Sequence, residues 1–142
     1  MILEGDITIP YKWTTGPTVG RFLAELRDNQ RIVGARCQGC QKVYVPPPDV
    51  CGACFKPLSD WVELSGEGLV VAVSTIYRDS PWRPRPAPYT LALIRLDGAD
   101  TCLLHLAREG VKTGDRVRPR FKSDRVGSLL DIESFVPLPE SE

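Results

Sequence analysis

Apolar side chains at three- and four-residue spacing mark one short amphipathic helix near the start of the chain. The residues of this pattern are Val19, Phe22, Leu23 and Leu26, with Arg21, Glu25 and Arg27 falling elsewhere. Such a stripe is typical of the face by which a helix packs on a protein core. We expect Thr18 to be the N-cap and the helix to end between Glu25 and Asn29.

The residues before this helix, 1–17, combine prolines and a glycine with the aromatic side chains of Tyr11 and Trp13. They predict an extended arm, and its large apolar groups are unusual for a disordered tail. We therefore expect the arm to lie against a surface, which is either the body of its own chain or a partner.

The pattern changes to β structure after the helix. Residues 31–36 and 43–45 predict two short strands, and a second group begins at Trp61. The segments of that group are 61–65 continuing through 68–78, then 88–97, 101–107, 115–122 and 129–136. Asp97-Gly98 is a tight-turn signal between two of them. Five short strands predict a small barrel, for which the OB-fold is the commonest candidate.

Four cysteines between the two groups of strands have the spacing of a metal site. They form the pairs Cys37/Cys40 and Cys51/Cys54, and each pair encloses two residues, one of them a glycine. Two such knuckles can direct four thiolates at one point, most often around zinc, and four protein ligands make the site structural. An iron site of rubredoxin type uses the same ligands, whereas two disulfides would need an oxidising compartment.

These elements divide the chain into three parts. Residues 1–30 form an arm and helix, 31–60 a rubredoxin-like zinc ribbon, and 61–142 an OB-fold barrel with a C-terminal tail. The three prolines 46–48 predict a stiff connection between the knuckles, because each proline fixes φ. The predicted fold class is mainly β.

Composition narrows the classes of function. The 142 residues include 18 Lys+Arg and 18 Asp+Glu, and a net charge of zero counts against a nonspecific nucleic-acid binder. The first residues lack the features of a signal peptide, and no apolar run has the length of a membrane span. Five cysteines, four of them in metal spacing, fit a reducing compartment, so we expect a cytoplasmic protein.

The loop between the first two barrel strands, residues 78–89, is a candidate contact site. It concentrates prolines, arginines and aromatic groups, among them Trp82, Arg83 and Arg85. Arginine can bind phosphate through a fork of N–H groups, and Trp82 offers a flat surface for stacking. The alternative is a loop folded over its own barrel with Trp82 as the plug.

A row of basic side chains alternates with apolar ones near the end of the chain. Its members are Arg116, Arg118, Arg120 and Lys122. The row is either an anion site or, as we favour, one side of cross-strand pairs with Asp131 and Glu133. Pro119 cannot donate to a ladder, so this strand is expected at an edge or a bulge.

Candidates for independent catalysis are missing from the sequence. His105 is the only histidine, and a lone histidine on a strand is usually a surface group or one satisfied by the fold. Cys102 is expected to be a buried thiol. The sequence shows no Ser-His-Asp arrangement, no Gly-rich phosphate loop and no close pair of carboxylates, which argues against an enzyme that acts alone.

The order of the motifs resembles the zinc-ribbon plus OB-fold family formerly named DUF35. An amphipathic helix precedes the two cysteine pairs, with three prolines between the pairs. The later motifs are Trp61-Val-Glu-Leu-Ser-Gly-Glu-Gly68, Pro88-Tyr89, Arg95-Leu-Asp-Gly98, Val117 to Phe121 and Phe135-Val-Pro137. The resemblance runs from about residue 18 to residue 137.

The resemblance implies a non-catalytic accessory subunit of a thiolase-type, or thiolase-like aldolase, complex that acts on acyl-CoA thioesters. It implies a hetero-oligomer with a thiolase-like subunit, a metal ligand set of Cys37, Cys40, Cys51 and Cys54, and a barrel that helps to hold or hand over CoA. On that basis Trp82, Arg83 and Arg85 become candidate CoA contacts.

Two other functions compete with this interpretation. Zinc ribbons and OB barrels also occur in nucleic-acid binders, which need exposed strand aromatics and a positive groove. The candidate strand aromatics are Trp61, Tyr77, Tyr89, Phe121 and Phe135. The third function is electron transfer by a rubredoxin-like iron site.

Overall fold

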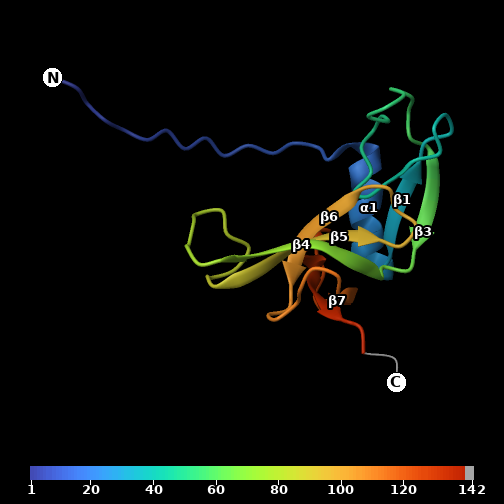
Figure 1. Cartoon of the computed structure of the whole chain (residues 1–142). Helices are drawn as coiled ribbons and strands as arrows, with labels where there is room; N and C mark the ends of the chain where they lie inside the picture. Colours follow the sequence, from blue (N-terminus) through green and yellow to red (C-terminus); the bar gives the residue numbers. More distant parts are fainter. Residues whose placement is uncertain (140–142) are drawn as a thin grey trace.

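The computed structural model describes residues 1–139, which form a helix, a three-stranded sheet and a closed five-stranded barrel (Figure 1). The elements are α1 (Gly16–Asn29), β1 (Ile32–Arg36), β2 (Val43–Tyr44), β3 (Asp60–Leu64), β4 (Gly68–Ile76), β5 (Tyr89–Leu96), β6 (Cys102–Ala107), β7 (Arg116–Phe121), the 3-10 turn η1 (Leu129–Asp131) and β8 (Ile132–Pro137). The predicted mainly-β class is confirmed.

Helix α1 buries the face that its spacing predicts, with Phe22 and Leu26 almost wholly enclosed. It begins earlier than expected. Thr15 occupies the N-cap position and Pro17 lies in the first turn, where a missing N–H costs nothing, while Thr18 is buried inside the helix. The helix ends where Gln30 adopts a left-handed conformation with φ 53°.

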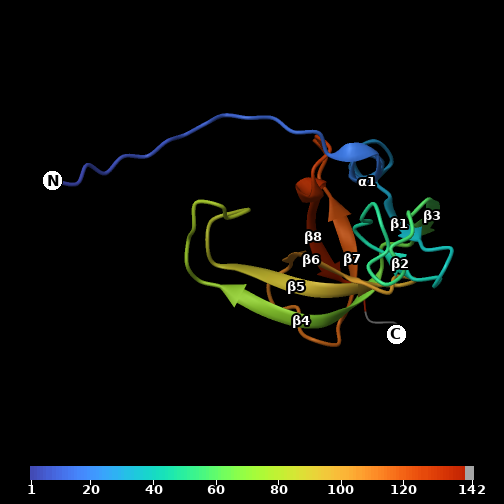
Figure 2. The ribbon, with the colours of Figure 1, turned by 90° about the horizontal axis from the view of Figure 1, so that it is seen from above.

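The barrel has the strand order β4-β5-β6-β8-β7. It closes where Gly68 and Leu69 of β4 pair with β7. A side chain at position 68 would place its Cβ 2.7 Å from the carbonyl oxygen of Arg95, so glycine allows β4 and β5 to approach. The outer half of β4 runs beyond the closure and forms a long hairpin with β5 (Figure 2).

The prediction that residues 61–65 continue into the first barrel strand is wrong. Strand β3 pairs with β1, from Ile32↔Leu64 to Arg36↔Asp60, and so belongs to the small sheet β2-β1-β3. Gly66, at φ 83°, turns the chain between β3 and β4. The three-part division of the chain stays a prediction, and residues 140–142 of its third part lie outside the described residues.

One apolar core joins the helix, the small sheet and the barrel. It includes Phe22 of α1, Ile32 of β1, and Ile94 and Phe135 of the barrel. The helix packs on β1 and on η1. The ribbon and the barrel therefore share one core. We expect a change that destabilises one of them to destabilise the other as well.

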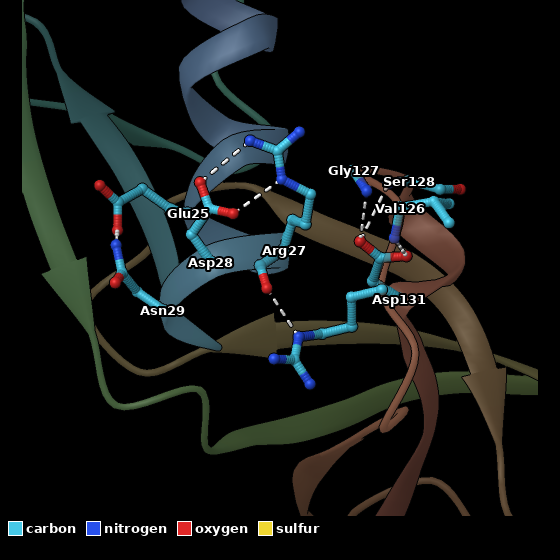
Figure 3. A network of polar contacts seen from close by, with 9 residues as sticks. Glu25, Arg27, Asp28, Asn29, Val126, Gly127, Ser128 and Asp131 are labelled. Carbon is cyan, nitrogen blue, oxygen red and sulfur yellow. Dashed lines mark hydrogen bonds and ion pairs between the residues drawn. The ribbon is translucent and has the colours of Figure 1, made fainter.

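The loop before η1 is fastened to the end of α1 by a polar network (Figure 3). Arg125 Nε donates to the carbonyl oxygen of Arg27 at 2.8 Å. Asp131, which is buried, accepts from the backbone N–H groups of Val126, Gly127 and Ser128. Asp131 therefore serves the turn, and the prediction that it pairs with the basic row is wrong. Glu133 does pair with Arg120, at 2.7 Å.

Two exposed segments project from the same side of the body, the arm and the tip of the β4–β5 hairpin (Figures 1 and 2). Residues 1–15 of the arm are all exposed, so the arm does not use the body of its own chain as its surface. Among the described residues, no helix combines the length and apolar character required to cross a bilayer.

Candidate functional site

The four cysteines meet at the tip of the ribbon. Their sulfur atoms lie within 4.8 Å of one another, and the Sγ atoms of Cys40 and Cys51 are 3.6 Å apart. A tetrahedral zinc with Zn–S bonds of about 2.3 Å has sulfur–sulfur distances of about 3.8 Å. The donor set therefore fits a tetrahedral metal ion with only small adjustments.

Each knuckle is built by the same backbone turn. The carbonyl oxygen of Cys37 accepts from Gln41 N at 2.7 Å, and that of Cys51 accepts from Phe55 N at 2.9 Å. Gln41 and Phe55 both have a left-handed φ, 63° and 57°. The residue that follows the second cysteine of each pair thus makes the turn, a role that sequence reasoning did not assign because neither residue is a glycine.

Tyr44 is a neighbour of the cluster that sequence reasoning missed. Its hydroxyl lies 3.2 Å from Cys51 Sγ, and backbone N–H groups of Ala53 and Cys54 lie 3.4 Å from the same sulfur. The hydrogen bond with the Tyr44 hydroxyl lowers the pKa of Cys51 to about 6. The only sequence signal was an aromatic hydroxyl on a two-residue strand that follows the first knuckle.

Cys54 is a weak acid in this cluster. The hydrogen bond with the Cys40 sulfur, followed by burial, raises the pKa of Cys54 to about 12. Four thiolates at this spacing repel one another, so the cluster needs a bound cation to hold them all in the charged form. Cys37 and Cys51 are buried and Cys40 and Cys54 are half-buried.

The hairpin loop is open, and Trp82 does not plug the barrel. The indole of Trp82 is 92% exposed, so the alternative of a loop folded over its own barrel is wrong. Arg83 binds within the loop, to Asp79 at 3.3 Å and to the carbonyl oxygen of Ser80. Asp79 also accepts from Ala87 N at 2.8 Å. Asp79 therefore shapes the loop and occupies Arg83.

Arg85 lies apart from the other two candidate CoA contacts. It lines a cavity of about 390 Å³ at the base of the hairpin, whose apolar wall includes Val73 and Val111. It also lines an adjoining cavity of about 480 Å³, together with Arg108 and Arg120. Glu109 lines both cavities, so the surroundings of Arg85 are basic but not purely so. Trp82 and Arg83 line neither cavity.

Two of the four basic side chains of the row, Arg116 and Arg120, are paired with acidic side chains. Arg116 donates to Asp97 at 2.7 Å and lies 3.6 Å from Glu67, while Arg120 bonds Glu133. These contacts confirm cross-strand pairing for Arg120 and show that the partners of Arg116 lie in the connections next to β4 and β5. The row does not present the continuous positive surface that an anion site of four basic groups would need.

The strand aromatics do not form a stacking face. Phe135 is buried, and Trp61 lies half-buried on β3 under the guanidinium of Arg21, 4.5 Å from the ring centroid. Tyr89 and Phe121 are half-buried. Tyr77 is exposed, but it lies at the start of the hairpin loop.

His105 serves the fold. Its ring is buried, with Nε2 3.0 Å from the carbonyl oxygen of Leu129 and Nδ1 3.3 Å from that of Leu106. Burial lowers the pKa of His105 and keeps the ring neutral. Cys102, which was expected to be a buried thiol, is only half-buried.

Two family models match the chain. The model of the rubredoxin-like zinc ribbon domain of ChsH2 matches residues 24–58, and that of the C-terminal OB-fold domain of ChsH2 matches residues 61–122. A DUF35 domain-containing scaffold protein of Methanocaldococcus jannaschii is 29% identical over 80 residues. That match covers 56% of this chain and only 57% of the archaeal protein.

Solved structures agree with these matches. A DUF35-family protein of unknown function from Sulfolobus solfataricus is 31% identical, with a TM-score of 0.62 over 74% of this chain and 78% of that one. The Ltp2-ChsH2(DUF35) aldolase shares the fold at 24% identity, with a TM-score of 0.61 over 83% of this chain and 93% of that one. The chain belongs to the DUF35 family, which includes ChsH2 and joins a zinc ribbon to an OB-fold barrel.

Proposed function

We propose that this protein is a non-catalytic accessory subunit of a thiolase-type, or thiolase-like aldolase, complex that acts on acyl-CoA thioesters. The observation that carries the proposal is the fold shared with the Ltp2-ChsH2(DUF35) aldolase over 83% of this chain. That enzyme is named for two proteins, one of them a DUF35 protein. The shared fold includes both the ribbon and the barrel, the two units that a docking subunit would present together.

In this proposal the cysteine cluster holds one structural zinc ion. Cys37 and Cys40 follow β1, and Cys51 and Cys54 precede β3, so the ion would cross-link the two ends of the ribbon. When bound, zinc would offset two of the four negative charges of the thiolates, stabilise all four in the charged form and supply folding energy. With four protein ligands, it has no open position for substrate.

The barrel side of the subunit would contact CoA through the hairpin. Arg85 lies between the two cavities, where a guanidinium can bind a phosphate of CoA, and the exposed Trp82 can stack on the adenine. Arg83 is the weakest of the three candidates, because Asp79 already binds it. Support for the CoA role comes from the exposure of Trp82, the positive charge of Arg85 and the two cavities that Arg85 lines.

The nucleic-acid alternative has less support. An OB-fold reader of single strands needs stacking aromatics along a basic groove, but the aromatic side chains of the strands are buried or half-buried and two arginines of β7 are paired with acids. The zero net charge points the same way.

The direct test is a reconstitution assay. The thiolase-like subunit and this chain are purified separately, and turnover of acetoacetyl-CoA and related thioesters is measured for each and for the mixture. We expect no turnover by this chain alone and a higher rate for the mixture than for the thiolase-like subunit. Turnover by this chain alone that disappears in a Cys102→Ala or His105→Ala variant would contradict the non-catalytic role.

A further inference from the structure

Four apolar side chains of the arm alternate with other residues. Ile7, Ile9, Tyr11 and Trp13 occupy every second position, and their exposed fractions are between 70% and 88%. The rings of Tyr11 and Trp13 lie together, with centroids 5.3 Å apart. In an extended chain every second side chain points to the same face, so this segment of about 23 Å carries one continuous apolar face.

The backbone of the same segment has one complete edge and one interrupted edge. In an extended chain the N–H and C=O groups of alternate residues point to opposite edges. Pro10 belongs to the even-numbered residues, and it has no N–H to donate. The odd-numbered residues, which also bear the apolar side chains, keep all their donors and acceptors. The segment can therefore extend a sheet on one edge, while Pro10 discourages a further strand on the other.

The position of the arm indicates what kind of surface it meets. The arm and the β4–β5 hairpin project from the same side of the molecule in both views (Figures 1 and 2). The hairpin tip exposes Tyr77 and Trp82, so a single partner on that side would meet both apolar projections. The arm also lies outside the ranges 24–58 and 61–122 that the family models match.

We propose that residues 7–13 add as a strand to an open sheet edge of the thiolase-like subunit, with their apolar face in a groove beside that edge. This inference rests on the proposed function and names the mode of contact. The odd-numbered residues make the main-chain hydrogen bonds, and the four apolar side chains fill the groove. Because the arm lies outside the matched family ranges, it selects the partner, whereas the ribbon and barrel supply the common scaffold.

Three variants separate main-chain pairing from side-chain contact. Ile9→Pro removes an N–H from the odd-numbered edge and also a side chain, Ile9→Ala removes only the side chain, and Thr8→Pro places the same stiff residue on the even-numbered edge. The dissociation constant for the thiolase-like subunit is measured by calorimetry for each variant. All three should keep the zinc content and melting temperature of the parent chain, because the arm makes no part of the core.

We expect Ile9→Pro to bind about tenfold more weakly than Ile9→Ala, from the loss of one buried hydrogen bond, and Thr8→Pro to bind within about threefold of the parent. Equal binding by Ile9→Pro and Ile9→Ala, or equal losses from the two proline variants, overturns strand addition and leaves the accessory role intact. Failure of the parent chain to bind overturns both proposals. A parent chain that dimerises alone, and that Ile9→Pro makes monomeric, shows that the arm binds a second copy instead.

Discussion

Several residues owe their roles to contacts that no sequence pattern reveals. Asp131 was placed by alternation on a strand facing the basic row, yet it turns back to cap η1. Tyr44 reaches a sulfur seven residues away along the chain. His105 is enclosed between two carbonyl oxygens. Alternation predicts which face of a strand a residue occupies, but it does not show that the strand expected at residue 129 begins only at Ile132.

Asp131→Asn should lower the free energy of unfolding by about 1–3 kcal/mol, the cost of losing charge-assisted acceptors for buried N–H groups. Burial alone would raise the pKa of Asp131, but the N–H groups of Val126, Ser128 and Gly127 together outweigh it and hold the pKa below its usual value. Chemical denaturation at pH 7 measures the loss.

The same carboxylate predicts a pH dependence with a definite sign. Because its folded pKa is lowered, Asp131 stabilises the fold above about pH 4, the pKa of a free aspartate. That contribution disappears as the pH falls through the lowered folded-state pKa of Asp131, so the stabilities of the parent and Asp131→Asn should converge in acid. Asp124→Asn, an exposed change in the same loop, is the control and should match the parent throughout. A constant difference between parent and Asp131→Asn at every pH would contradict this account.

Arg85 and Arg83 form a matched pair for the CoA proposal. Arg85→Ala should weaken CoA binding to the complex by about tenfold, as expected for one lost charge-assisted contact, and the effect should be larger at low salt, where phosphate attraction is least screened. Arg83→Ala should have a smaller effect, because Asp79 holds that guanidinium. If neither change alters affinity while the complex stays intact, the loop does not contact CoA.

At the scale of elements, the sequence predicts the cysteine cluster of the ribbon best. The spacing of the two cysteine pairs predicts the cluster, because each knuckle directs its two sulfurs to one point. Helix α1 and the strands β5 to β8 follow from periodicity, with shifts of a few residues at their ends. Strand β3 was misassigned because an alternating pattern does not identify the neighbouring strand, and Gly66 separates it from β4 by a turn that also resembles a bulge in sequence.

Removal of one cluster ligand should release the metal and destabilise the whole protein. Elemental analysis should find about one zinc per parent chain. The Cys40→Ser variant should lose most of it. Its melting temperature should also fall, because Ile32 and Leu64 of the ribbon sheet lie in the core shared with the barrel. Bound iron with visible absorbance in the parent chain would contradict the zinc assignment.

Tyr44→Phe tests the same metal site with a smaller change than Cys40→Ser. It removes only the hydroxyl that contacts Cys51 Sγ, so the site should keep its four ligands and one zinc. Loss of a group that orients a ligand typically lowers metal affinity about tenfold or more, which competition with a chelator will measure. Unchanged affinity would show that the Tyr44 hydroxyl does not support the metal site.

At the scale of the whole molecule, the sequence predicts the modules but not their union. Cysteine spacing and strand alternation indicate a ribbon and a barrel. The single core that joins them gathers side chains from distant segments, such as Phe22 of the helix and Phe135 of the barrel, and no local pattern reports this. The open hairpin was also undetermined, because prolines stiffen a loop equally well in a folded-over or a projecting form.

The central claim is partnership, and light scattering on a sizing column after co-expression with the thiolase-like protein tests it most directly. We predict co-elution as a stable hetero-oligomer with at least two copies of each chain, since the family resemblance implies a thiolase-like subunit that is itself a dimer, with one accessory subunit on each half. Permanent subunits usually bury more than the roughly 1,600 Å² of a standard interface, so the complex should survive dilution to micromolar concentration. Separate elution of the two chains, with equal thiolase activity in the absence of this protein, would contradict the account.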